Sequence, residues 1–165
     1  HICAQIPSNV NFCDQLLEME PPIPSWGRQF YVGRFEGKTE YALRIISSEP
    51  ATQVFVNNQL VGNLANAGQF YEDNHMKDNA LITTNKPVLV AQFAQSSDAD
   101  SVKVGDPFML FITPTEQFLK NYTFATPVKG DWHHYINLVV PTAGLSTLKL
   151  YGRLIPAKYY KANVI

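Results

Sequence analysis

The feature that most constrains the fold is an alternation of apolar and polar residues, repeated in short segments that are separated by turn-forming residues. In Glu40–Ser47 the side chains of Leu43 and Ile45 fall on one side of an extended chain, while Arg44 falls on the other. A period of two residues is typical of a β-strand with one buried face. This segment is therefore predicted to be a strand.

The same pattern predicts about ten short strands over the whole chain. Asn57-Asn58 tolerates positive φ and suits a tight hairpin turn, and Pro87–Gln95 is apolar enough for a central strand. Helical turns are expected only at Asp14–Glu20 and Thr115–Lys120. The other predicted strands are Phe30–Phe35, Thr52–Asn57, Gln59–Leu64, Gln69–Asp73, Ala80–Thr83, Phe108–Ile112, Tyr122–Ala125, Trp132–Val140 and Thr147–Tyr151.

These elements predict an all-β fold, an antiparallel β-sandwich or barrel-like module with at most one or two short helical turns. A length of 165 residues without a fixed-period repeat favours a single domain over residues 1–165. Within it, a Cys-containing, Pro-rich N-terminal segment (residues 1–24) precedes a β core (residues 25–165). Because the chain starts at His1 without a methionine, we expect a fragment of a larger multidomain protein.

Charge and hydropathy exclude several classes of partner. The 13 basic and 14 acidic residues form no basic stripe that would neutralise nucleic acid or anionic lipid. No apolar run approaches the roughly 20 residues of a membrane helix, so no membrane insertion by this chain is expected.

Cys3 and Cys13 enclose a segment with Pro7 and several Ser and Asn residues, which favour turns and would bring the two thiols together. A disulfide across this loop would stabilise the fold by roughly 3 kcal/mol in the chain-entropy model and would indicate an oxidising compartment. The alternative is a pair of buried free thiols. Asn121-Tyr122-Thr123 is an N-glycosylation sequon if the protein is eukaryotic and secreted, and otherwise a chance tripeptide.

Sequence motifs for catalysis are absent. The chain has no glycine-flanked nucleophile elbow, no phosphate-binding glycine loop and no His-Glu-x-x-His helix, so no enzymatic activity and no cofactor are predicted. His133 and His134 would point to opposite faces of a strand and could not chelate one ion together. A weak calcium candidate consists of Asp98, Asp100 and Asp106, for which a solvated acidic loop is the alternative.

Aromatic side chains are the stronger candidates for recognition, because Tyr and Trp combine a rigid apolar body with a polar tip. Those nearest to predicted turns or chain ends form the candidate binding surface, although each of them could instead belong to the core: Trp26, Tyr71, Trp132, Tyr159 and Tyr160.

Several ordered blocks of sequence, spread over nearly the whole chain, resemble the IgGFc-binding-protein N-terminal domain family. The likeness departs from the family pattern at Gln15 and Pro50. The blocks are Cys3-Ala4-Gln5-Ile6-Pro7, Phe12-Cys13-Asp14, Pro21-Pro22, Trp26-Gly27, Ser48-Glu49, Asn66–Tyr71, Lys86–Phe93, Asp106–Met109, Pro114–Phe118, Tyr122-Thr123-Phe124 and Tyr135-Ile136-Asn137.

The resemblance implies an extracellular, β-rich and non-catalytic protein, since members occur in animal mucus and other secretions and in bacterial surface proteins. We therefore expect a secreted or cell-surface adhesion or structural module that contacts an extracellular protein or glycan and is joined to further extracellular domains. The alternative is a lectin-like glycan-binding domain, assisted by calcium. A hydrolase is the third and weakest reading, because no nucleophile and base pair can be recognised.

Overall fold

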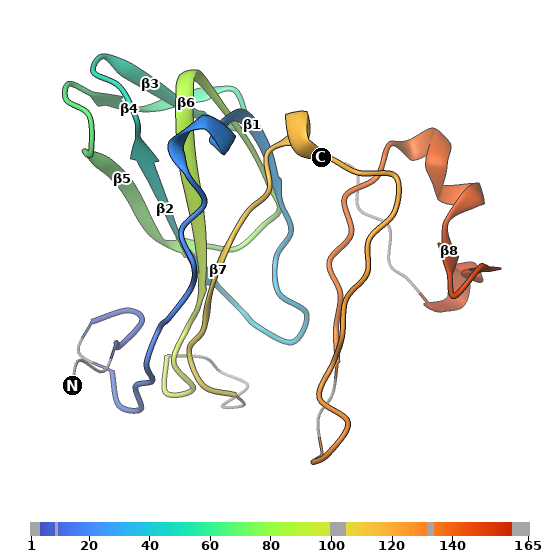
Figure 1. Cartoon of the computed structure of the whole chain (residues 1–165). Helices are drawn as coiled ribbons and strands as arrows, with labels where there is room; N and C mark the ends of the chain where they lie inside the picture. The colour runs from blue at the N-terminus through green and yellow to red at the C-terminus, as the bar shows by residue number, and fades with distance from the viewer. Residues whose placement is uncertain (1–3, 9, 100–104, 132–133, 160–165) are drawn as a thin grey trace.

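The computed structural model describes residues 4–8, 10–99, 105–131 and 134–159. Its regular structure is β, as predicted, with nine strands and only short 3-10 turns among the described residues (Figure 1). The strands are β1 (Gly27–Val32), β2 (Tyr41–Ser47), β3 (Thr52–Val56), β4 (Gln59–Leu64), β5 (Phe70–Met76), β6 (Ala80–Ala94), β7 (Met109–Phe111), β8 (Lys149–Leu150) and β9 (Arg153–Leu154). The 3-10 turns are η1 (Ile23–Ser25), η2 (Thr115–Gln117), η3 (Thr142–Thr147) and η4 (Ala157–Tyr159).

The long strand β6 organises the main sheet, which has seven antiparallel strands. The first half of β6 pairs with β1 and β3, and its second half pairs with β2 and β7. Val88 of β6 is paired with both Gly27 of β1 and Ser47 of β2. Strands β4 and β5 extend the sheet beyond β3 and β2, and the sheet curls into a half-barrel (Figure 1).

The main core lies on one face of this curled sheet. It contains the fully buried side chains of Leu43 and Ile45 from β2, Val54 from β3 and Ile82 and Val90 from β6. The alternation in the sequence thus predicted correctly which side of β2 is buried, because successive side chains of a strand point to opposite faces.

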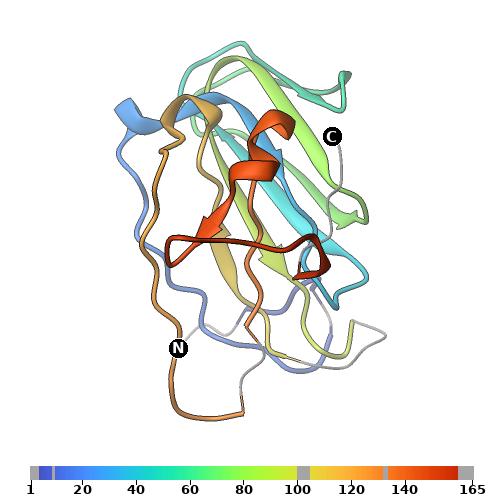
Figure 2. The same cartoon turned by 90° about the vertical axis from the view of Figure 1, so that its right-hand side faces the viewer.

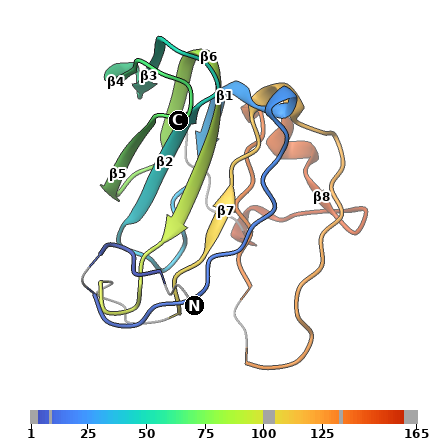
Figure 3. The same cartoon turned by 60° about the vertical axis from the view of Figure 1, so that its left-hand side comes forward.

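The N-terminal segment covers part of the opposite face. Ile6 and Leu16 pack against a second apolar cluster formed by Ala42, Ala91 and Phe93. Figures 1 and 3 show this segment running alongside β7 before it turns into η1 and β1. Both faces of β6 are consequently covered near its end, which explains why its last seven residues are buried.

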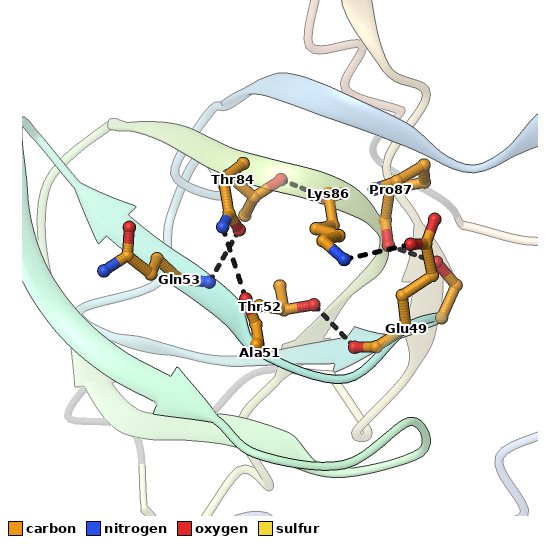
Figure 4. A network of polar contacts seen from close by, with 9 residues as sticks. Glu49, Ala51, Thr52, Gln53, Thr84, Lys86 and Pro87 are labelled. Atoms are coloured by element: carbon orange, nitrogen blue, oxygen red, sulfur yellow. Dashed lines mark hydrogen bonds and ion pairs between the residues drawn. The ribbon is translucent and has the colours of Figure 1, made fainter.

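A network of polar contacts fixes the bend of β6 against the loop that joins β2 to β3 (Figure 4). Lys86 Nζ lies 3.2 Å from a carboxylate oxygen of Glu49, and the hydroxyl of Ser48 donates to the carbonyl of Pro87 at 2.6 Å. The side chain of Asn85 accepts from the amide of Gln53 at 2.7 Å. These residues include two of the family-like sequence blocks, so those blocks serve the scaffold.

The chain after Phe118 leaves the sheet, and residues 119–159 are called the C-terminal arm below. Figures 1 and 2 show the arm on one side of the sheet. None of its described residues is buried. Asn137 anchors the arm, because its Nδ2 donates to the carbonyls of Gly33 and Arg34 at 3.4 and 3.1 Å. Just before the arm, Glu116 in η2 accepts from the amide of Arg28 at 2.9 Å.

The arm is where sequence-based prediction failed. Tyr122–Ala125 is not a strand, and neither are the described residues 134–140 of the predicted strand Trp132–Val140. Their alternating pattern is present, but no neighbouring strand pairs with these described residues. The remaining predicted segment, Thr147–Tyr151, contributes β8 to a two-stranded hairpin with β9.

The helical predictions were also partly wrong. Asp14–Glu20 contains no helix, whereas Thr115–Lys120 contains η2 as expected. Four 3-10 turns replace the one or two predicted, and the longest has six residues. Within the described residues no helix is long and apolar enough to cross a membrane.

Candidate functional site

A cavity of about 300 Å³ lies between the N-terminal segment, β7 and η2. Its wall is mainly apolar and includes Met19, Trp26, Leu110 and Ile112, with Glu18 as the acidic group. Trp26 is half-buried, and its indole N–H donates to the carbonyl of Pro21 at 2.9 Å. The cavity is at the lower limit of ligand pockets and suits an apolar side chain better than a large ligand.

A polar cluster around Glu40 lies at the end of β5. Glu40 Oε2 is 2.7 Å from His75 Nδ1 and accepts from the side chain of Gln95 at 3.4 Å, and Lys77 Nζ is 3.3 Å from Glu40 Oε1. The hydrogen bond with His75, followed by those with Lys77 and Gln95, outweighs partial burial and lowers the pKa of Glu40 below its usual value. His75 thus holds a carboxylate in place.

Arg44 on β2 lies at the second cavity, of about 150 Å³, beneath the N-terminal segment. Its guanidinium pairs with Glu72 and lies over the rings of Phe70 and Phe93 at 4.8 and 5.6 Å. Burial alone would raise the pKa of Glu72, but hydrogen bonds from Arg44 and Asn74 and the charge of Arg44 lower it overall. The charges and hydrogen-bonding groups of Arg44, Glu72 and Asn74 are paired within the cluster, so its role is structural.

The predicted aromatic residues that the structure describes lie in separate places. Tyr71 is half-buried and packs against the main core, and burial, followed by the charge of Asp73, raises the pKa of its hydroxyl. Tyr159 is 70% exposed at the far end of the arm, with Lys158 Nζ 4.8 Å above its ring. Trp132 and Tyr160 lie outside the described residues.

The other predicted site residues are placed individually. Asp98 and Asp106 are exposed, whereas Asp100 lies outside the described residues, and the described part of the chain holds no group of three metal-ligating side chains. Cys13 is not a free thiol, but Cys3 lies outside the described residues, so their bridge stays a prediction. Asn121 is exposed, which suits a glycosylation site and does not test it.

Of the described residues, those of the C-terminal arm form the most extensive exposed apolar surface, which sequence reasoning missed. Alternation in Trp132–Val140 indicated a strand, and the whole arm was included in the predicted β core (residues 25–165). Twelve large hydrophobic side chains of the arm are exposed instead: Leu119, Tyr122, Phe124, Val128, Tyr135, Ile136, Leu138, Val139, Leu150, Tyr151, Leu154 and Tyr159. This number of exposed apolar side chains makes the arm the candidate contact surface.

The fold and the exposed arm define an all-β protein built on a half-barrel of antiparallel strands. The family model described as IgGFc binding protein matches residues 1–162. The chain therefore belongs to the IgGFc-binding family, and the resemblance seen in its sequence blocks is confirmed. This is a family of binding domains that occur in extracellular proteins, and it is not a known catalytic family. No curated protein matches the chain, and no solved structure does.

Proposed function

We propose that this chain is a non-catalytic extracellular adhesion or structural module that uses its C-terminal arm to contact other proteins. The observation that carries the proposal is the set of apolar side chains exposed on the arm. An exposed Leu is ordinary by itself, but a dozen large apolar groups within one segment are costly to leave in water. A protein partner that covers them removes this cost.

The rest of the molecule supports a role in contact. The polar clusters around Glu40 and Arg44 are satisfied internally and stiffen the sheet. A rigid scaffold that presents a separate apolar segment is an arrangement suited to recognition. Under this proposal the whole chain acts as one module, the bridge between Cys3 and Cys13 fixes the N-terminal segment, and both belong to a secreted or cell-surface protein.

An immunoglobulin Fc fragment is the first partner to test, because the family is named for Fc binding. Surface plasmon resonance with the full chain would compare Leu138→Ser in the arm with Leu60→Ser in β4. These two leucines are matched controls, since their side chains are 51% and 50% exposed. Leu138→Ser is expected to weaken binding about tenfold, the loss typical of an interface anchor, and Leu60→Ser to leave it unchanged.

Two results would contradict the proposal. If Fc binding weakened equally in both variants, or if it weakened in neither of them, the contact would lie outside the arm. A saturable, sugar-selective signal on a glycan array that disappears when calcium is removed would instead establish the lectin-like function.

A further inference from the structure

The C-terminal arm differs in charge from the rest of the chain. Its residues 119–159 contain five basic side chains and one acidic side chain, Asp131. Residues 1–118 contain seven basic and thirteen acidic side chains. The near-neutral chain is therefore divided into an acidic body and a basic arm, and the basic groups of the arm alternate with its exposed apolar side chains.

The N-terminal segment has the complementary character over residues 14–20, called the acidic strip. Leu17 and Met19 are 86% and 88% exposed, and the strip carries Asp14, Glu18 and Glu20 without any basic residue. Glu18 and Met19 also line the cavity of about 300 Å³. The strip and the cavity together present exposed apolar groups, an apolar recess and negative charge side by side.

The arm does not cover the strip of its own chain. Figure 1 shows β7 and β1 between the N-terminal segment and the end of the arm. The hydrogen bonds of Asn137 hold the arm against the residues that follow β1, and the hydrogen bond of Glu116 holds η2, just before the arm, against β1 itself. Both halves of a complementary surface are thus exposed on one molecule.

We propose that the arm of one chain docks on the acidic strip and the adjoining cavity of a second copy of this chain. The inference rests on the proposed function of the arm as a contact surface and names its partner. Basic groups of the arm would lie against the strip carboxylates, and apolar side chains of the arm would enter the cavity beside Trp26. Such opposite charges select the partner and the register of docking.

The exposed apolar area is sufficient for a stable interface. If each large apolar side chain of the arm buries roughly 100 Å², a reciprocal exchange of two arms removes on the order of 2,000 Å² from water, which is the size class of stable dimers. Reciprocal docking closes a dimer, whereas one-way docking builds a head-to-tail chain. Either product requires the same contact between arm and strip.

Sedimentation equilibrium of the full chain tests the proposal with charge-reversed variants. The arm variant carries Lys149→Glu and Arg153→Glu, the strip variant carries Glu18→Lys and Glu20→Lys, and the control carries Asp78→Lys and Asp98→Lys outside the strip. All these residues are exposed, so each variant is expected to fold, which circular dichroism would verify.

The wild-type chain and the control are expected to associate at an ionic strength of about 0.1 M. The arm variant alone and the strip variant alone should each associate at least about tenfold more weakly, and mixing them should restore association, because their reversed charges again match. Raising the ionic strength to about 1 M, which shortens the Debye length to about 3 Å, should weaken the wild-type contact similarly.

Three outcomes would overturn the inference: a wild-type chain that stays monomeric, association that neither charge reversal alters, and variants whose mixture does not associate. Fc binding by a strictly monomeric chain would refute self-association and leave the proposed function standing. Loss of both Fc binding and self-association in Leu138→Ser would support both.

Discussion

Replacing Gln92 with leucine is expected to lower the free energy of unfolding by about 1–2 kcal/mol. The Gln92 side chain is only 1% exposed, and its Nε2 donates to the carbonyl of Gly33 at 2.8 Å. Leucine has a similar volume, so no large cavity forms, but the carbonyl keeps only the longer contact with Asn137 at 3.4 Å. A carbonyl without a good donor costs about 1–3 kcal/mol, which partial hydration of the half-exposed Gly33 reduces.

Thermal and urea unfolding of Gln92→Leu would measure this loss. For a chain of this length each kcal/mol shifts Tm by about 2–4 °C, so Tm should fall by about 2–8 °C while the urea m-value stays unchanged. Gln59→Leu, at an exposed position beside the β3–β4 turn, is the matched control and should change stability by less than about 0.5 kcal/mol.

A double-mutant cycle with Asn137→Ala extends this prediction to the arm. Gln92 and Asn137 donate to the same carbonyl, so their effects should be coupled by about 0.5 kcal/mol or more. A Gln92→Leu variant as stable as the wild type would refute the reasoning, because the buried amide would then contribute nothing beyond its volume. Strict additivity would show that the arm does not share this anchor.

Three further predictions concern other parts of the fold. Gly27→Ala should destabilise the fold by about 1–3 kcal/mol in urea unfolding, because the added methyl group would overlap the ring of Pro114. Reducing the proposed bridge of Cys3 and Cys13 should cost up to about 3 kcal/mol, and intact mass before and after reduction would verify the bridge. The pKa of Glu40 in the fold is lowered from 4.5, so its ionised form stabilises the fold above pH 4.5, and this contribution is lost as the pH falls through the lowered pKa. Glu40→Gln should therefore flatten the acid side of a stability–pH profile.

Local sequence patterns predicted the strands of the sheet well and their connections poorly. Ala80–Thr83 and Pro87–Gln95 were predicted as separate strands, because Asn85-Lys86-Pro87 interrupts the apolar run and proline cannot donate to a ladder. In the structure they are the two halves of β6. The side chain of Asn85 instead accepts from the amide of Gln53 in β3, and Lys86 pairs with Glu49 in the β2–β3 loop. These are contacts between distant segments that no local pattern reveals.

The arm and the cavity show the same limit for the candidate site. Trp26 was a candidate from its residue type and its place near a predicted turn, and only the packing of β7 and η2 against the N-terminal segment gives it a cavity. Tyr71 was a candidate on the same grounds. In the structure Gly62 of β4 lies so close that a Cβ added to it would be 3.6 Å from the Tyr71 ring, and Tyr71 packs against the core.

The sequence by itself determined the all-β class, the buried face of β2 and membership of a binding family, because alternation, turn residues and ordered blocks are local properties of the chain. Only the tertiary structure decided which apolar segments are buried. Residues 134–140 alternate much as residues 40–47 do, yet one segment lies between paired strands and the other remains exposed. Burial depends on which distant segments supply hydrogen bonds and apolar neighbours, and that is a property of the whole fold.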